Sequence, residues 1–170
     1  MGRVTFLLGG ARSGKSTRAL ALAVNAPRTF LATGEPFDDE MADRIQAHKA
    51  ERGPDWGLIE APLEIARAVE AHDHGTLVID CLTLWLNNLI YHQRDVDAES
   101  ARLLAALGAT PTPAHIILVS NEVGLAIAPE NALARRFRDM QGRLNQQVAA
   151  AADHVELLVA GLPVTVKAAR

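Results

Sequence analysis

Residues 9–16 read Gly9-Gly10-Ala11-Arg12-Ser13-Gly14-Lys15-Ser16 and fit the pattern G-x-x-x-x-G-K-[ST] at every position. An apolar run precedes them and a helix-like pattern follows, an order that is typical of a phosphate-binding P-loop. The glycines let several backbone N–H groups face one anion, and the helix N-terminus adds the positive end of its dipole. Lys15 is placed to reach the β- and γ-phosphates, and the Ser16 hydroxyl to ligate Mg²⁺. The motif therefore predicts that the chain binds a nucleoside triphosphate.

The composition is that of an ordinary globular protein. The 170 residues suit one domain spanning 1–170, with 49% hydrophobic and 22% charged residues. A net charge of −3 disfavours nucleic acid as a partner, because proteins that bind it are usually basic. Cys81 is the only cysteine, which excludes an intrachain disulfide and suits a reducing cytoplasm. No apolar run approaches the roughly 20 residues of a membrane helix, and no signal-peptide pattern is present, so we predict a cytoplasmic protein without a membrane span.

Apolar runs alternate with helical patterns along the chain. Strands are expected at 4–8, 29–33, 57–60, 76–81, 115–120, 155–160 and 164–167. Helices are expected at 15–24, 39–51, 63–71, 82–91, 98–107 and 131–152. The last strand follows a turn at Gly161-Leu162-Pro163 and is expected to run antiparallel to its predecessor. This alternation predicts an α/β protein with a mainly parallel, doubly wound sheet.

Polar side chains follow two of the expected strands. Asp80 closes an apolar run as the acid of a Walker-B strand does, and there it would hold Mg²⁺ directly or through water. Ser120, Asn121 and Glu122 end another strand, where ligands of open α/β sheets bind. These three are candidates to orient a nucleophile or contact the γ-phosphate. The alternative is that Asn121 and Glu122 only build the turn before Gly124, and the residues leave both interpretations open.

Histidines occur in two polar segments. His48 lies in the helical pattern 39–51, which opens with acids and closes with cations, as suits a helix dipole. Neighbouring cations would depress its pKa and keep the imidazole neutral and nucleophilic. A lone helical histidine is more often structural, so the residues alone leave its role open. The segment His72-Asp73-His74 has no third metal ligand nearby and is interpreted as a solvated turn.

The expected C-terminal helix has an apolar stripe at steps of three and four, which core packing explains: Leu133, Phe137, Met140, Leu144 and Val148. Arginines flank this stripe, and we expect most of them on a solvated face, with one or two available to a phosphate or a neighbouring subunit: Arg135, Arg136, Arg138 and Arg143.

Together these segments resemble the bifunctional adenosylcobinamide kinase / adenosylcobinamide-phosphate guanylyltransferase family of cobalamin biosynthesis. The resemblance runs nearly end to end. Beyond the P-loop it is carried by the blocks Asp39-Glu40-Met41, Arg44-Ile45, His48, Asp80-Cys81-Leu82-Thr83, Ser120-Asn121-Glu122-Val123-Gly124 and Pro129-Glu130-Asn131, and by matching residues up to Asn145-Gln146. One departure lies at Ala126, where the family usually has a second glycine, and this substitution bears on the shape of that loop.

The resemblance implies a RecA-like P-loop NTPase fold, a homotrimer and two reactions. In the first, adenosylcobinamide takes a γ-phosphoryl group from ATP or GTP, with Lys15 and Mg²⁺ assisting. In the second, GMP passes from GTP through a covalent GMP-histidine to give adenosylcobinamide-GDP and pyrophosphate. His48 occupies the place of that histidine in the family's motif.

Further nucleotide-binding residues are implied in the same way, in addition to Gly9, Gly10, Ala11, Arg12, Ser13, Gly14, Lys15, Ser16 and Asp80. They are Thr33, Gly34, Glu35, Lys49, Ala50, Glu51, Arg52 and Glu60.

Two alternatives remain beside this interpretation. A monofunctional P-loop kinase with a structural His48 would form no covalent nucleotide adduct. A RecA-like NTP-binding module acting on DNA or as a regulator is disfavoured by the acidic balance and by the lack of an aromatic-rich basic groove.

Overall fold

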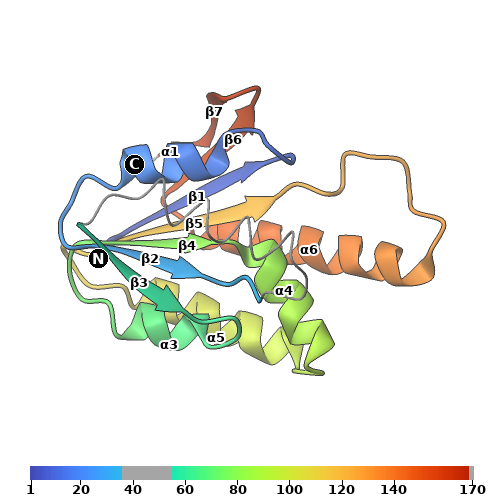
Figure 1. Cartoon of the computed structure of the whole chain (residues 1–170), viewed down its shortest axis with the longest axis horizontal. Coiled ribbons are helices and arrows are strands. Elements are labelled where there is room, and N and C mark those ends of the chain that lie inside the picture. The colour runs from blue at the N-terminus through green and yellow to red at the C-terminus, as the bar shows by residue number, and fades with distance from the viewer. Residues whose placement is uncertain (36–54, 169–170) are drawn as a thin grey trace.

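A parallel β-sheet covered by helices on both faces forms the centre of the protein (Figure 1). The structure, a computed structural model, describes residues 1–35 and 55–168. Within these ranges the sheet has seven strands, and only the last pair, β6–β7, is antiparallel. In spatial order the strands are β3 (Trp56–Glu60), β2 (Arg28–Ala32), β4 (Thr76–Asp80), β5 (His115–Asn121), β1 (Arg3–Gly9), β6 (His154–Val159) and β7 (Leu162–Lys167).

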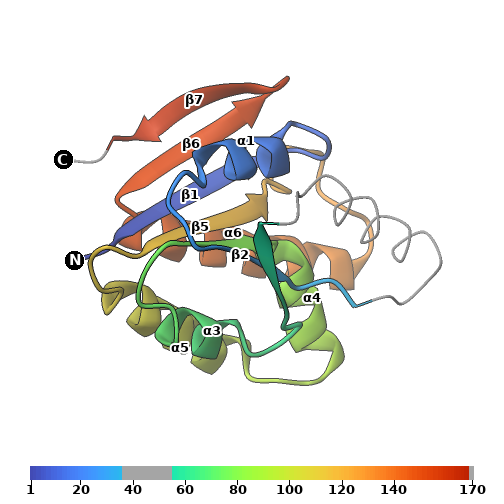
Figure 2. The ribbon, with the colours of Figure 1, turned by 60° about the vertical axis from the view of Figure 1, so that its left-hand side comes forward.

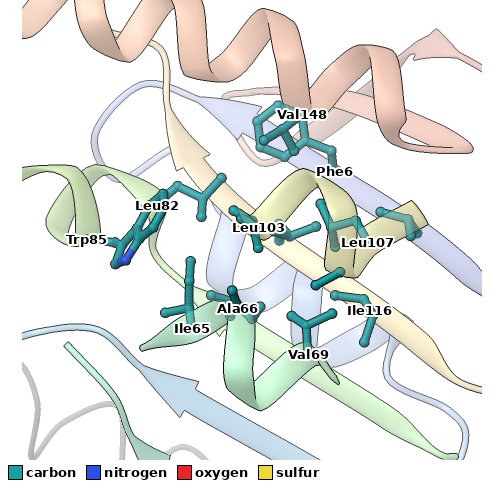
Figure 3. Packing of buried hydrophobic residues seen from close by; sticks show 14 of the residues in the cluster. Phe6, Ile65, Ala66, Val69, Leu82, Trp85, Leu103, Leu107, Ile116 and Val148 are labelled. Carbon is teal, nitrogen blue, oxygen red and sulfur yellow. The ribbon is translucent and has the colours of Figure 1, made fainter. Parts of the chain in front are cut away.

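The described residues form five helices: α1 (Lys15–Leu22), α3 (Ile65–Glu70), α4 (Leu82–Tyr91), α5 (Val96–Gly108) and α6 (Ala132–Ala151). Helix α1 covers one face (Figure 2), where Ala19 packs with Leu7 and Ile117 of the sheet. The other helices cover the opposite face, whose larger core is seen in Figure 3. Each central strand is therefore buried on both sides, as expected for a parallel sheet.

The sequence predicted this α/β fold class, the RecA-like P-loop NTPase architecture and the antiparallel edge strand, and the structure confirms them. The expected helix 39–51 lies outside the described residues. The turn prediction was wrong by two residues, because Ala160 and Gly161 alone make it, both with positive φ (51° and 81°). Leu162 and Pro163 already belong to β7. None of the described helices has the length and apolar character that crossing a membrane requires.

Core packing explains only part of the apolar stripe of α6. Leu144 and Val148 are buried, and Phe137 and Met140 are partly buried against the same core. Leu133, by contrast, is 64% exposed. The N-terminal half of α6 extends past the ends of the strands (Figure 1), and Leu133 belongs to the first turn of this helix.

An ion pair between half-buried Arg18 and buried Glu156 connects helix α1 to β6. Arg18 donates from Nε and Nη2 to the two carboxylate oxygens of Glu156, at 2.8 and 2.7 Å. His154 Nε2 lies 3.0 Å from Glu156 Oε1. The hydrogen bond from Arg18 lowers the pKa of Glu156 to about 2, although burial acts in the opposite direction. The position of the helix that follows the P-loop thus depends on an ionised Glu156.

We expect acid to destabilise the protein through Glu156. Because the folded-state pKa of Glu156 is about 2 and its ordinary value is 4.5, this contribution to stability is complete above about pH 4.5 and is lost as the pH falls through 2. At pH 7, Glu156→Gln should lower the free energy of unfolding by about 2–3 kcal/mol. It should also flatten the loss of stability below pH 4.5, as urea denaturation from pH 2 to 7 would measure.

Glu70→Gln is the matched control, because Glu70 is about half exposed and pairs loosely with Arg102 at 3.8 Å. An exposed pair of this kind contributes at most about 1 kcal/mol. Equal pH profiles for Glu156→Gln and the wild type would contradict the assignment.

Candidate active site

The P-loop leaves β1 at Gly9 and enters α1 at Lys15, with positive φ at Arg12 (55°) and Gly14 (94°). Two close approaches fix its path. A Cβ on Gly9 would lie 2.4 Å from Ser13 Oγ and 2.7 Å from the Leu158 carbonyl oxygen. A Cβ on Gly14 would lie 3.2 Å from the Cα of Gly161, whose N–H donates to the Ser13 carbonyl at 3.0 Å. The loop therefore rests directly on the β6–β7 hairpin.

The Lys15 ammonium bends back over the loop. Its Nζ donates to the Gly10 carbonyl oxygen at 2.5 Å and lies 3.4 Å from Ser13 Oγ. The residue is only 8% exposed. Burial lowers the pKa of Lys15, while the nearby Asp80 carboxylate opposes that shift. A phosphate in the loop would supply the anionic partner that the buried ammonium has only in part.

Ser16 and Asp80 meet although they lie far apart in the sequence. Ser16 Oγ donates to Asp80 Oδ2 at 2.6 Å, and β5 lies between the strands that carry the P-loop and Asp80. A hydroxyl and a carboxylate are the hard oxygen donors that Mg²⁺ prefers, and the nucleotide's phosphates and water complete its shell in P-loop sites. Nowhere in residues 1–35 and 55–168 do three or more His, Cys, Asp or Glu side chains gather into a metal site. The Ser16–Asp80 pair supplies two oxygen ligands that fit a Mg²⁺ ion bound together with a nucleotide.

Thr33 joins the ends of β2 and β4. Its buried hydroxyl accepts from the Cys81 N–H and donates to the Cys81 carbonyl, both at 2.8 Å. Asn88 Nδ2 donates to the Thr33 carbonyl at 2.7 Å. This side chain positions the Asp80–Cys81 segment, and a contact between Thr33 and nucleotide stays a prediction. Burial raises the pKa of the Cys81 thiol to about 12, so this thiol is not a nucleophile.

The other expected binding residues continue from the ends of neighbouring strands. Gly34 and Glu35 follow β2, and both Glu35 carboxylate oxygens lie 3.1 Å from His92 Nε2. Glu60 ends β3 opposite Ala32 at the same edge of the sheet. Five expected residues, catalytic or nucleotide-binding, lie outside the described residues: His48, Lys49, Ala50, Glu51 and Arg52. The roles of all these residues stay predictions.

A buried polar network behind β5 was not foreseen. Ser120 Oγ donates to Asn145 Oδ1 at 2.8 Å and accepts from Gln141 Nε2 at 3.0 Å. Asn145 Nδ2 donates to the Asn121 carbonyl at 3.1 Å, and the Asn121 N–H donates to Thr83 Oγ1 at 2.9 Å. The sequence signal that could have revealed this network is the i, i+4 spacing of Gln141 and Asn145 beside the apolar stripe of α6.

The structure also shows which contacts are made by two of the polar segments noted in the sequence. The Glu122 carboxylate accepts from the Gly124 N–H at 2.7 Å, so it builds the turn. His74 pairs with the exposed Asp73 at the surface, as a solvated turn predicts. The prediction fails at His72, which is half-buried and whose pKa is lowered by that burial.

A P-loop at the carboxyl edge of a parallel sheet, with a carboxylate two strands away, defines a P-loop nucleotide-binding protein. Residues 5–166 match the family described as cobinamide kinase / cobinamide phosphate guanyltransferase. The chain belongs to this family.

Three curated relatives extend the match to nearly full length. The bifunctional adenosylcobalamin biosynthesis protein CobU of Salmonella typhimurium is 41% identical, covering 94% of this chain and 97% of the relative. Its counterpart CobP of Pseudomonas aeruginosa is 42% identical, covering 95% of both chains. The Escherichia coli CobU is 37% identical, covering 94% and 97%. All three are named as bifunctional proteins.

Solved structures with a similar fold are more distant. The P4 protein of bacteriophage phi6 in complex with ADP has a TM-score of 0.45 at 15% identity, covering 95% of this chain and 52% of that one. The VirB11 ATPase of Brucella suis in complex with sulphate has a TM-score of 0.44 at 13% identity, covering 91% and 43%.

The contact between Gly9 and the β6–β7 hairpin predicts an asymmetry between adjacent glycines. Gly9→Ala would press a methyl group against the Leu158 backbone, whereas a Cβ on Gly10 meets nothing within 4 Å. We expect Gly9→Ala to lower the free energy of unfolding by about 1–3 kcal/mol, and Gly10→Ala to change it by less than about 0.5 kcal/mol. Thermal unfolding without nucleotide measures both, and equal effects of the two variants would contradict the packing described.

Proposed function

We propose that this chain phosphorylates adenosylcobinamide with a nucleoside triphosphate and then transfers GMP to the product. The observation that supports this most is the family match over residues 5–166, joined to a complete P-loop whose Ser16 meets Asp80. The relatives named as bifunctional match over nearly their whole length, so no additional domain is needed for a second activity. One domain spanning 1–170 would perform both reactions in the cytoplasm.

In the proposed kinase step, the terminal hydroxyl oxygen of the aminopropanol arm attacks the γ-phosphorus of ATP or GTP. The new O–P bond forms as the bond from the γ-phosphorus to the β–γ bridging oxygen breaks. The nucleoside diphosphate leaves with the electron pair, and the hydroxyl proton passes to solvent. The P-loop N–H groups and Lys15 would hold and neutralise the β- and γ-phosphates. When bound by Ser16 and Asp80, Mg²⁺ would add charge neutralisation at the β–γ oxygens.

In the proposed second step, the neutral imidazole of His48 attacks the α-phosphorus of GTP, and pyrophosphate leaves. A phosphate oxygen of adenosylcobinamide phosphate then attacks the same phosphorus, which forms adenosylcobinamide-GDP and frees the histidine. Lys49, Ala50, Glu51 and Arg52 are proposed to contact the nucleotide next to His48. Thr33, Gly34, Glu35 and Glu60 are proposed to contribute from the adjoining strand ends.

A homotrimer is part of the same proposal. Strand β7 is an edge strand whose Leu162, Val164 and Val166 alternate along one side and are 69%, 51% and 65% exposed. Exposed alternating apolar residues on an edge strand favour burial against another chain.

The Ser16–Asp80 pair predicts a Mg²⁺-dependent nucleotide affinity. Titration calorimetry with ATP should show tighter binding when Mg²⁺ is present, and Asp80→Asn should remove most of that difference. The kinase rate of Asp80→Asn should fall at least about 100-fold, because a charged oxygen ligand is lost. Asp73→Asn, at an exposed aspartate, should behave as the wild type. Unchanged Mg²⁺ dependence in Asp80→Asn would contradict the assignment.

The proposed transfer of GMP through His48 predicts that labelled GTP leaves a covalent label on the protein. The protein would be incubated with Mg²⁺ and GTP labelled at the α-phosphate, denatured, and tested for bound label. We expect an acid-labile, alkali-stable adduct that is absent in His48→Ala and retained in the control His74→Ala. Its formation should slow as the pH falls and the attacking imidazole becomes protonated. Absence of label on folded, GTP-binding wild-type protein would favour a monofunctional kinase.

A further inference from the structure

At the carboxyl end of β5, successive side chains point to opposite faces of the sheet. Ile116 and Leu118 belong to the core under α3–α6, whereas Ile117 and Val119 belong to the core under α1. Because successive side chains of a strand point to opposite faces, Ser120 points toward α6 and Asn121 toward α1. The hydrogen bonds of Ser120 with Asn145 and Gln141 of α6 agree with this alternation. Asn121 therefore lies on the face that carries the P-loop helix.

Strand β4 obeys the same rule. Leu77 and Ile79 belong to the α3–α6 side, and Val78 to the α1 side. Asp80 must then point to the α1 side, as its hydrogen bond with Ser16 requires. Asn121 and Asp80 thus project from the same face of the sheet, on neighbouring strands.

The register places Asn121 between the P-loop and Asp80. Asn121 pairs with Gly9 of β1, while Asp80 pairs with Val119 of β5. With strands about 4.8 Å apart and a rise of about 3.3 Å per residue, the Cα atoms of Asn121 and Asp80 are about 8 Å apart. A terminal phosphoryl group held by the P-loop would lie within reach of both side chains.

The backbone of Asn121 is held on both sides. Its N–H donates to Thr83 Oγ1 of α4, and its carbonyl accepts from Asn145 Nδ2 of α6. Its side-chain amide, in contrast, has no hydrogen-bond partner among the residues that the structure describes, and it is half-buried at the sheet edge. A rigid backbone with an uncommitted donor is the arrangement that a preorganised binding group needs.

We propose that Asn121 donates a hydrogen bond from Nδ2 to the γ-phosphoryl group of the bound triphosphate and aligns it for attack. This inference deepens the kinase half of the proposed function and rests on it. Asn121 forms no covalent bond and moves no proton. Its dipole stabilises negative charge on the γ-phosphoryl oxygens as the bond to the β–γ bridging oxygen breaks. A neutral amide suits this place, because a second carboxylate beside Asp80 would repel the phosphate.

The two neighbours of Asn121 are excluded by their contacts. The Ser120 hydroxyl is fully buried and engaged with α6. The Glu122 carboxylate is engaged by the Gly124 N–H. Of the three candidates at this strand end, only Asn121 has a side chain that the described contacts leave available to a phosphate.

A comparison of the kinase and guanylyl-transfer rates of Asn121 variants distinguishes a role at the γ-phosphate from a purely structural role. In Asn121→Ala, the kinase kcat should fall about 100-fold while KM for the nucleotide changes less than about threefold. Guanylyl transfer to supplied adenosylcobinamide phosphate should remain as in the wild type. Asn121→Asp should be slower still in the kinase step, and Asn87→Ala, at an exposed asparagine of α4, should match the wild type. An unchanged kinase kcat, or equal losses in both half-reactions, would overturn the proposal.

A binding measurement tests Asn121 independently of the corrinoid. ADP with aluminium fluoride mimics the γ-phosphoryl group in transfer, and ADP alone lacks it. Asn121→Ala should weaken binding of the mimic about tenfold and leave the affinity for ADP unchanged. Equal affinity of wild type and Asn121→Ala for the mimic would overturn the proposal. If the wild type binds the mimic but phosphorylates no cobinamide, the proposed substrate fails while the role of Asn121 stands.

Discussion

The parallel register of β1, β5 and β4 determines where every polar residue of the site lies. It places Gly9 beside Asn121, and Asp80 one strand further, with all three on the α1 side of the sheet. A slip of one residue in β4 would turn Asp80 to the opposite face and remove its hydrogen bond with Ser16. The register is strongly specified because these strands are buried on both faces, so a slip would also misplace the apolar residues of two cores. The site is therefore a property of the sheet as much as of the P-loop motif.

Buried polar contacts hold the segments around the site in the positions that the strand register sets. Arg18 and Glu156 fix helix α1, Thr33 fixes the segment after Asp80, and Asn145 fixes the backbone after Ser120. Apolar contacts would be indifferent to small shifts of these segments, whereas hydrogen bonds have narrow distance and angle limits. An anion-binding loop has to keep its N–H groups aimed at one point, so this directional fastening suits its function. The contacts of Thr33 and Asn145 lie at the carboxyl edge of the sheet, where the Ser16–Asp80 pair also lies.

Local signals made much of this predictable, and non-local contacts account for the rest. The P-loop, the strands and the acid at Asp80 follow from short patterns of glycine, apolar runs and helix periodicity. Periodicity tells which residues of α6 share a face but not how far the sheet extends beneath them, so the exposure of Leu133 was missed. The hairpin turn was misplaced because Ala160 adopts a positive φ that its residue type disfavours. Thr83 and Asn145 were invisible as partners of Asn121, because only the folded sheet brings α4 and α6 to the same strand end.

We propose that this one edge of the sheet serves both reactions. Phosphoryl transfer needs rigid polar groups around the γ-phosphate, and we propose that the strand ends at Gly9, Asp80 and Asn121 supply them. Nucleotidyl transfer needs a nucleophile that reaches the α-phosphate from elsewhere. Since Ala32 of β2 pairs with Asp80, the chain leaves β2 at the edge where the P-loop lies, and His48 follows Glu35 by thirteen residues. The proposed kinase groups are thus fixed by the sheet, and the proposed guanylyl acceptor His48 belongs to the segment that follows β2 in the sequence.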